Sequence, residues 1–229
     1  MDDLVKQLSA LPTSTLSDAL DRLGLPGQIP HVRPVDRSFR LAGVAYTLQY
    51  APVGDSGGTV GDFIDEVPAG SVIAIANEGR LTETVWGDLL TTVASSRGIS
   101  GTVIDGVCRD TPRSLELKYP IFSRGTYMRT GKDRVTLVAT QVEIRLSETP
   151  VRPGDLVFGD ADGVLAVSAG AAHEVLEVAT QIELAENGIR ALVLAGHRLD
   201  HARREFGYHT LQTNVRHRDD AVTRTEASC

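Results

Sequence analysis

Two short segments carry residue types that could do chemistry together. Residues 87–90 read Gly-Asp-Leu-Leu, and Arg109-Asp110 follows an apolar stretch. A glycine allows close approach to the backbone, and the free N–H groups of Leu89 and Leu90 at a helix opening can bind a carboxylate. An arginine offers a fork of donors to a carboxylate, and an aspartate is a hard oxygen ligand for Mg²⁺. A strand-end turn with a surface ion pair would give the same pattern, and the pattern alone leaves both interpretations open.

The elements that must position these segments alternate between helix and strand, which predicts an α/β fold. Strands are expected over residues 41–50, 72–76, 102–104, 121–123, 135–145, 156–158 and 164–167, and helices over 84–97, 111–118, 171–195 and 199–206. Thr15-x-x-Asp18 has the spacing of a capping box and predicts a helix opening that stops at Gly24. Asp105-Gly106 predicts a turn. Arg109-Asp110 therefore comes at the carboxyl end of a strand, where α/β proteins bind ligands.

Composition limits the classes of protein to consider. The chain has 229 residues, a net charge of −7 and 41% hydrophobic residues, which is enough for one sizeable core. Its acidic balance argues against a nucleic-acid partner. No apolar run approaches the ~20 residues that span a bilayer, and the N-terminus lacks the apolar region of a signal peptide. We expect a cytoplasmic protein with one domain over residues 1–206, followed by a polar tail over 207–229 that is disordered or wraps on a partner subunit.

Several familiar sites are missing from the sequence. The glycines over residues 54–61 do not match a dinucleotide-binding loop, and neither a phosphate loop nor a G-x-S-x-G nucleophile elbow is present. The two cysteines, Cys108 and Cys229, make neither a disulfide framework nor a zinc site, and Cys108 is expected to be a buried, inert thiol. His197 and His201 have the spacing of a shared metal site but no evident third ligand, so a solvated helix face is the expectation.

The spacing between the two segments resembles a known family. Asp88 is followed by twenty residues and then Arg109-Asp110. With the flanking stretches WGDLL, TVIDGVCRD, YPIFSRGTYMR and RPGDLVFGDADGVLAV, this D-x20-R-D pattern resembles the RraA-like family, from about Thr15 to Gly207. That family contains divalent-metal-dependent 4-hydroxy-4-methyl-2-oxoglutarate / 4-carboxy-4-hydroxy-2-oxoadipate aldolases, and also a regulator that inhibits a bacterial ribonuclease.

The resemblance implies an architecture and an assembly. The fold would be an α/β, layered β/β/α domain resembling swivelling phosphohistidine-type domains, with a C-terminal helical extension. The protein would assemble as a homotrimer or homohexamer with its sites between subunits. A glutamate from a neighbouring subunit would reach each site, and Glu186 in the segment ENGIR is the best match, with Glu183 second.

The resemblance also implies a role for each site residue. Arg109 would bind the carboxylate of a 2-oxo acid substrate, together with Gly87 and the amides of Leu89 and Leu90. Asp110 would coordinate Mg²⁺ or Mn²⁺, mostly through water. Asp88 would orient a water or a substrate hydroxyl near the metal. Position 113 is arginine where several aldolases are expected to carry an acidic residue.

The implied reaction is cleavage of a 4-hydroxy-2-oxo dicarboxylic acid, such as 4-hydroxy-4-methyl-2-oxoglutarate, to pyruvate. This cleavage needs an electron sink, which is either a lysine Schiff base or a metal-bound enolate. The chain has only three lysines, and Lys132 is the one plausible amine, so a metal-bound enolate is the simpler expectation. Decarboxylation of oxaloacetate is an expected side activity. The alternative is a non-catalytic regulator that binds a ribonuclease. The first suspects for substrate choice are Arg113, Arg124 and loop 52–61.

Overall fold

Four parallel strands rich in Val, Ile and Ala form the centre of the structure. They are β3 (Leu41–Pro52), β4 (Ser71–Thr84), β5 (Gly101–Cys108) and β6 (Ile121–Thr126), paired in this order. Every residue of β5 is buried, as expected for a central strand of a parallel sheet covered on both faces. The computed structural model describes residues 2–54, 60–208 and 211.

Antiparallel strands extend this centre on both sides. The order across the sheet is β1-β11-β10-β3-β4-β5-β6-β2, and β7 pairs with the far half of β3. These added strands are β1 (Gln28–Ile29), β2 (Arg33–Pro34), β7 (Val135–Thr140), β10 (Leu156–Asp160) and β11 (Gly163–Val167). A separate hairpin consists of β8 (Ile144–Leu146) and β9 (Thr149–Val151).

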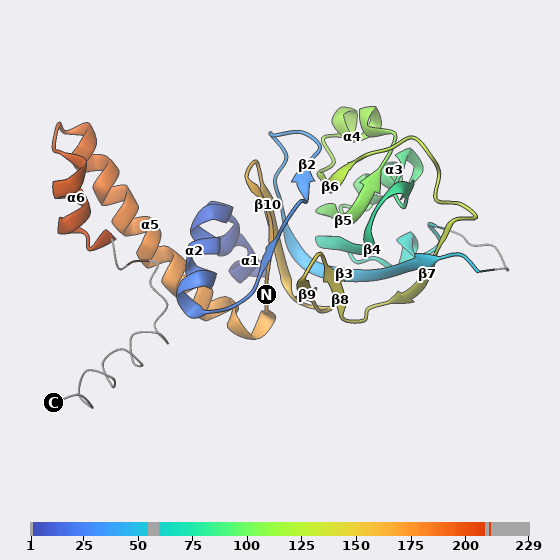
Figure 1. Ribbon diagram of the computed structural model, residues 1–229, viewed down its shortest axis with the longest axis horizontal. Helices are drawn as coiled ribbons and strands as arrows, with labels where there is room; N and C mark the ends of the chain where they lie inside the picture. The colour runs from blue at the N-terminus through green and yellow to red at the C-terminus, as the bar shows by residue number, and fades with distance from the viewer. Residues whose placement is uncertain (1, 55–59, 209–210, 212–229) are drawn as a thin grey trace.

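Two groups of helices cover different parts of the sheet (Figure 1). The first group is α3 (Asp88–Ser96) and α4 (Thr111–Leu117), which connect β4 to β5 and β5 to β6. The second group is α1 (Asp2–Ser9), α2 (Thr13–Leu23) and α5 (Ala172–Leu194), next to β10 and β11. The far half of α5 extends away from the sheet, with α6 (Leu199–Glu205) beside it. Two short 3₁₀ turns are η1 (Ile64–Glu66) and η2 (Ala169–Ala171).

Three hydrophobic clusters fill the spaces between these layers. One cluster packs α3 against the sheet around Ile75, Trp86 and Ile104. A second lies on the opposite face, between the sheet and the β8–β9 hairpin. The third lies beneath α1, α2 and α5. The fold is therefore the mixed α/β arrangement expected from the sequence, with its C-terminal helical extension present.

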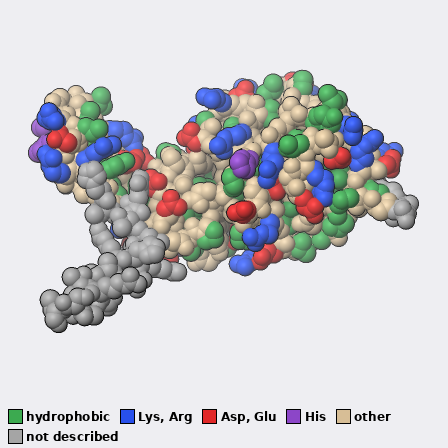
Figure 2. Space-filling view, viewed as in Figure 1, with side chains coloured by type: hydrophobic (Ala, Val, Ile, Leu, Met, Phe, Trp, Pro, Cys, Tyr) green, Lys and Arg blue, Asp and Glu red, His purple; other side chains and the backbone are tan. Residues whose placement is uncertain are grey.

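The surface of the described residues carries both signs of charge. Figure 2 shows acidic and basic side chains interspersed over the visible face, with apolar side chains between them. No helix in the described part of the chain is long and apolar enough to cross a membrane. Most of the predicted tail over 207–229 lies outside the described residues.

Most predicted elements are present, and four predictions are wrong in detail. The helix predicted from residue 84 begins at Asp88, because β4 continues to Thr84. Asp105-Gly106 lies inside β5 and does not form a turn. The strand predicted over 135–145 divides into β7 and β8, with Gln141 in the left-handed conformation between them. The predicted capping box does not form, since α2 begins at Thr13.

A carboxylate distant in sequence caps α2 in place of that box. Asp160, at the end of β10, accepts hydrogen bonds from the Thr13 amide (3.0 Å) and the Thr13 hydroxyl (2.6 Å). It also accepts one from the Asp162 amide (2.9 Å). Burial alone would raise the pKa of Asp160, but these hydrogen bonds outweigh it and hold the pKa below its ordinary value.

We predict that Asp160→Ala lowers the free energy of unfolding by about 1–3 kcal/mol near neutral pH, because it leaves buried donors unpaired. A carboxylate whose pKa is depressed by folding stabilises the protein above its unfolded pKa and loses that effect as the pH falls. Urea unfolding of both proteins at about pH 7 and about pH 3 tests this. The difference should shrink at the lower pH, and an equal difference at both would contradict the assignment.

Candidate functional site

A glycine turn brings the two predicted segments together. Gly87 is the N-cap of α3 and has extended backbone angles (φ −149°). A Cβ atom added at Gly87 would lie 2.8 Å from Asp110 Oδ2 and 3.4 Å from Arg109 Nε. The chain just after β5 thus meets the start of α3, and only glycine at position 87 leaves room for the Asp110 carboxylate in its present position.

Asp110 turns its carboxylate toward α3 instead of capping its own helix. It occupies the N-cap position of α4 in the left-handed conformation (φ 56°, ψ 36°) and makes no side-chain cap hydrogen bond. Its Oδ2 lies 3.2 Å from Arg109 Nε and accepts a long hydrogen bond (3.4 Å) from the Asp88 amide. A non-glycine residue in this conformation is strained by about 1–3 kcal/mol, and such strain is concentrated at functional sites.

Arg109 is anchored through its backbone and half-exposed through its side chain. Its amide donates to the Trp86 carbonyl (3.0 Å), which ties the end of β5 to the chain just before Gly87. Its side chain is 38% exposed and uses Nε toward Asp110. The terminal guanidinium nitrogens make no hydrogen bond to the described residues, so they can hold a carboxylate in the bidentate manner.

Asp88 and the first amides of α3 lie next to these groups. Asp88 Oδ1 accepts a hydrogen bond from the Leu89 amide (2.8 Å). The Leu89 amide, which was expected to bind the substrate carboxylate, is therefore already bonded within the chain. The amide of Leu90 belongs to the same first turn, where N–H groups lack carbonyl partners within the helix. Leu89 itself is 77% exposed, which is unusual for a leucine beside a polar site.

A cavity of about 320 Å³ opens beside this constellation. Arg109, Gly87 and Asp88 line it together with both predicted leucines. The remaining lining residues come from the start of α3, the chain before it, and two further segments: Val60, Gly61, Asp62, Ile64, Thr84, Val85, Trp86, Val93 and Thr130. Such a concave, largely apolar cavity with a few convergent polar groups is typical of a ligand site.

Buried side chains hold the Gly87 turn in place. Trp86 donates from Nε1 to the Thr91 hydroxyl (2.9 Å), and that hydroxyl donates to the Gly87 carbonyl (2.9 Å). The Trp86 ring stacks on Tyr119, with 6.1 Å between ring centroids. Trp86 begins the WGDLL segment quoted above, but the sequence pattern assigned a role to neither Trp86 nor Thr91. Their signal was present, since Trp86 is the chain's single tryptophan and Thr91 lies one helical turn after Gly87.

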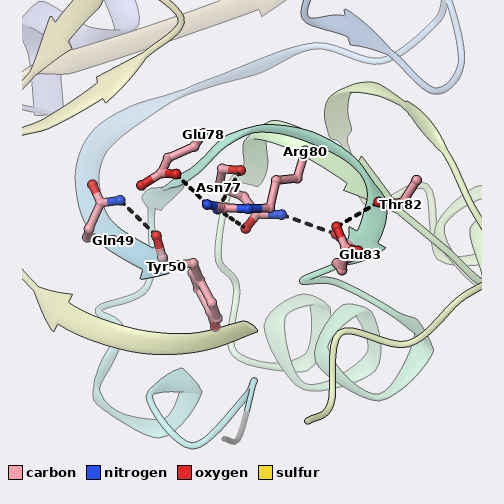
Figure 3. Close-up of polar contacts among 7 residues, drawn as sticks. All are labelled: Gln49, Tyr50, Asn77, Glu78, Arg80, Thr82 and Glu83. Atoms are coloured by element: carbon pink, nitrogen blue, oxygen red, sulfur yellow. Dashed lines mark hydrogen bonds and ion pairs between the residues drawn. The ribbon is translucent and has the colours of Figure 1, made fainter. Parts of the chain in front are cut away.

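The irregular end of β4 leads directly into this turn. Glu78 and Gly79 take left-handed conformations, and the pairing of β4 with β5 shifts register between Ala76 and Thr84. Figure 3 shows the polar contacts that hold this irregular segment together. Buried Asn77 donates a hydrogen bond to the Glu83 carbonyl. Arg80 donates to the Asn77 carbonyl and pairs with Glu78. These contacts fix the path of the chain toward Trp86 and Gly87.

The predicted glutamate lies elsewhere in the same chain. Glu186 is on the extending part of α5, at the opposite end of the molecule from α3 (Figure 1). It pairs with Arg190 (3.3 Å), as does Glu183 (3.2 Å), which also accepts from the Thr15 hydroxyl. One chain therefore does not bring Glu186 to its own site, and its arrival from a neighbouring subunit stays a prediction.

Two suspects for substrate choice are engaged in other contacts. Arg124 pairs with buried Asp105 and donates to the Ser147 hydroxyl (2.9 Å), in a different hollow of about 860 Å³. Arg113 donates to Thr92 (3.1 Å) and pairs with Glu116 (2.8 Å). The third suspect, loop 52–61, lies partly outside the described residues, but its last residues, Val60 and Gly61, do line the site cavity.

The donor set suits a metal that keeps much of its water. Asp88 and Asp110 supply two carboxylates at the Gly87 turn, and the described residues contain no cluster of three or more side chains able to hold a metal ion. Mg²⁺ typically binds through one or two carboxylates and several waters, so the residues fit it. Cys108 is buried as predicted, and His197 and His201 are exposed.

Comparison with known proteins shows which family this chain belongs to. The sequence model of the RraA-like family (Aldolase/RraA) matches residues 13–166, which include the Gly87 turn and Arg109-Asp110. The chain belongs to the RraA-like family. The match covers the sheet and its connecting helices and ends before α5.

Relatives of this RraA-like chain carry different names. A Halalkalibacterium halodurans protein named "Putative 4-hydroxy-4-methyl-2-oxoglutarate aldolase" is 36% identical over 177 residues, covering 77% of this chain and 82% of that protein. The Legionella pneumophila protein DlpA is 36% identical over 211 residues, but this chain spans only 34% of its length.

Two solved structures share the fold of this chain. An uncharacterized protein from Pseudomonas syringae pv. tomato is 39% identical with a TM-score of 0.83, covering 89% of this chain and 98% of that one. Streptomyces coelicolor RraAS2, described as an unusual member of the RNase ES inhibitor RraA protein family, is 28% identical with a TM-score of 0.75. That match covers 82% of this chain and 96% of that one. The family thus includes proteins named for catalysis and proteins named for inhibition.

We predict that Gly87→Ala weakens Mn²⁺ binding about tenfold or more, because the new methyl group displaces the Asp110 carboxylate. The free energy of unfolding should change by less than about 1 kcal/mol, since the displaced atom ends an exposed side chain. Electron paramagnetic resonance titration with Mn²⁺ measures the affinity. Gly170→Ala is the matched control, because nothing lies within 4 Å of a Cβ at Gly170. Equal affinity in Gly87→Ala and wild type would contradict the assignment.

Proposed function

We propose that this chain is a divalent-metal-dependent lyase that cleaves a 4-hydroxy-2-oxo acid, such as 4-hydroxy-4-methyl-2-oxoglutarate, to release pyruvate. One observation carries the proposal. The guanidinium of Arg109, the carboxylate of Asp110 and the amide of Asp88 meet at the Gly87 turn, beside a cavity that Arg109 and Asp88 line. An arginine for a carboxylate next to two oxygen ligands is what a 2-oxo acid and a divalent cation need.

Arg109 fixes the reacting end of the substrate. Its terminal nitrogens bind the substrate carboxylate, while its contact with Asp110 holds the guanidinium plane. The adjacent 2-oxo group then lies toward the two aspartates. Holding the carboxylate in this way orients the bond between C3 and C4 for cleavage, and orientation of this kind lowers the barrier substantially.

Asp110 and Asp88 would hold the divalent cation. When bound, the cation supplies an electron sink by polarising the 2-oxo group of the substrate. The Asp110 carboxylate lies 3.2 Å from Nε of Arg109, whose positive charge also attracts the substrate. Mg²⁺ and Mn²⁺ both suit an oxygen-rich site of this kind.

A proton must leave the C4 hydroxyl as the C3–C4 bond breaks. Asp88 is exposed, and only its Oδ1 is engaged with the Leu89 amide. Its Oδ2 can therefore orient a water that accepts the proton. The electron pair of the C3–C4 bond moves onto the pyruvate fragment as its enolate, and protonation at C3 completes pyruvate. Oxaloacetate yields the same enolate on losing CO₂, so we propose decarboxylation of oxaloacetate as a side activity.

We also propose that the site is completed by a second copy of the chain, in a trimer or hexamer. Glu186 lies in the far half of α5, which extends away from the sheet (Figure 1), whereas Glu183 accepts a hydrogen bond from Thr15 on α2. Leu184, Val193 and Leu194 on the same helix are exposed, although they are apolar. An extending helix with exposed apolar residues suits contact with a neighbouring subunit, and Glu186 would then enter that subunit's site.

The alternative function is regulation of a ribonuclease by binding to it. The similarity to RraAS2 favours this alternative, although at 28% identity. A protein that acts only through its surface has no need of a cavity lined by Arg109 and Asp88, with Asp110 paired to that arginine. The two functions therefore differ in what they require of Arg109.

We predict pyruvate release from 4-hydroxy-4-methyl-2-oxoglutarate, and more slowly from oxaloacetate, in the presence of Mg²⁺. Excess EDTA should abolish it. Asp110→Ala and Arg109→Ala should each lower kcat/KM by about a hundredfold or more, because each removes a charge that stabilises the transition state. Arg109→Lys should remain impaired, since lysine lacks the planar fork. Coupled detection of pyruvate measures all of these rates.

Controls come from an exposed ion pair that lies outside the cavity and outside α5. Arg152→Ala and Glu143→Ala break this pair and should leave the rates unchanged. Glu186→Gln should lower kcat if a neighbouring copy supplies that carboxylate. Failure of the folded, metal-loaded wild type to release pyruvate from either compound would contradict the proposal and favour the regulatory alternative.

A further inference from the structure

Arg113 connects the two helices that begin at the site. It lies in α4, three residues after Asp110, and its amide donates a hydrogen bond (3.1 Å) to the Asp110 carbonyl. Its side chain crosses to α3, where Nε donates to the Thr92 hydroxyl (3.1 Å). That hydroxyl donates to the Asp88 carbonyl (2.8 Å). These three hydrogen bonds, the Arg113 clamp, join the backbones of the two acids that would hold the divalent cation.

The two acids have little other contact with each other. The Asp88 amide donates a long hydrogen bond (3.4 Å) to the Asp110 carboxylate, and no second hydrogen bond joins the two residues in the described part of the chain. They also follow different strands, because Asp88 begins α3 after β4 and Asp110 comes after β5. A small movement of either helix would therefore change the distance between their carboxylates. Mg²⁺ tolerates little departure from octahedral geometry, so such a movement would weaken its binding.

The strained backbone of Asp110 gives a further reason for this clamp. Asp110 is in the left-handed conformation (φ 56°), and its own side chain does not cap α4. Residues in such conformations persist only where surrounding contacts hold them. Arg113 provides two of these contacts, since its amide bonds the Asp110 carbonyl and its side chain ties α4 to α3.

Arg113 does not reach the cavity beside Arg109. It is not one of the residues that line this cavity, which disfavours the role in substrate choice that the sequence suggested. Its Nη1 pairs with Glu116 (2.8 Å) on the same helix, and an ion pair this exposed contributes only about 0–1 kcal/mol to stability. The bond from Nε to Thr92 differs from that pair, because it is partly buried and joins two helices.

We propose that Arg113 is a positioning residue for the metal site, which sets the distance between the Asp88 and Asp110 carboxylates through its Nε bond to Thr92. The inference rests on the proposed function, because it concerns the cation which that function requires. The effect comes from the hydrogen bond and not from the positive charge of Arg113. Without the bond, α4 and α3 can move apart, so the cation is held less tightly and in a different geometry.

Two variants of equal length separate the hydrogen bond from the charge. Arg113→Met and Arg113→Gln are both uncharged, and the methionine Cε and glutamine Nε2 stand at the position of the arginine Nε along the side chain. Only glutamine keeps a donor there. Arg113→Met should raise the dissociation constant for Mn²⁺ about five- to tenfold, and Arg113→Gln should stay within about twofold of the wild type. Electron paramagnetic resonance titration of the full chain measures both. The spectrum of bound Mn²⁺, which reports the geometry of its ligands, should change only in Arg113→Met.

The partner hydroxyl gives an independent test. Thr92→Val keeps the branched shape of the side chain and removes the hydroxyl, so it should weaken Mn²⁺ binding as much as Arg113→Met. The double variant should bind within about twofold of either single variant, because both changes remove the same clamp. Glu116→Gln is the matched control, since it removes the ion pair of Arg113 and leaves the bond to Thr92. It should leave the affinity unchanged.

The outcomes separate this role from the proposed function. Equal Mn²⁺ affinity in Arg113→Met and the wild type would overturn the positioning role. An equal loss in Arg113→Met and Arg113→Gln would also overturn it, because the charge would then be responsible. In either case, pyruvate release by the wild type would leave the lyase proposal standing. The predicted order of affinities without pyruvate release would support the clamp and contradict the lyase. A folded wild type that binds no Mn²⁺ would contradict both.

Discussion

The close approach of Gly87 to the Asp110 carboxylate is the contact on which the site depends. It requires a residue without a side chain at the start of α3 and an aspartate in a left-handed conformation after β5. The parallel pairing of β4 with β5 brings these two positions to the same edge of the sheet. Trp86, Thr91 and the backbone bond from Arg109 hold the turn there.

The sequence correctly predicted the helices and strands whose limits depend on residues close to them in the chain. β3, the β10–β11 hairpin and α5 are confirmed. The errors arise where distant residues decide. Asp160 caps α2 from across the chain, so no signal near Thr13 could reveal where that helix begins. Pairing with β4 and β6 extends β5 through Asp105-Gly106, although that dipeptide favours a turn when judged alone.

The residues that meet at the Gly87 turn were easier to predict than the shape of the cavity beside them. Residue types and the D-x20-R-D spacing indicated Asp88, Arg109 and Asp110, which the structure brings together. The cavity, in contrast, depends on Val60 and Ile64, whose apolar character is indistinguishable in sequence from that of any core residue. The role proposed for Glu186 depends on a second copy of the chain. The shape of the cavity follows from packing between distant segments, which a sequence pattern reports poorly.

The central claim is that a divalent cation and a 2-oxo acid occupy one site at the Gly87 turn. Nuclear magnetic relaxation of the pyruvate methyl protons, with Mn²⁺ bound to the protein, tests it directly. The account predicts strong paramagnetic relaxation in the wild type, which Mg²⁺ in excess reverses and Asp110→Asn removes. Pyruvate and Mn²⁺ that both bind without enhanced relaxation would show two separate sites and contradict the account.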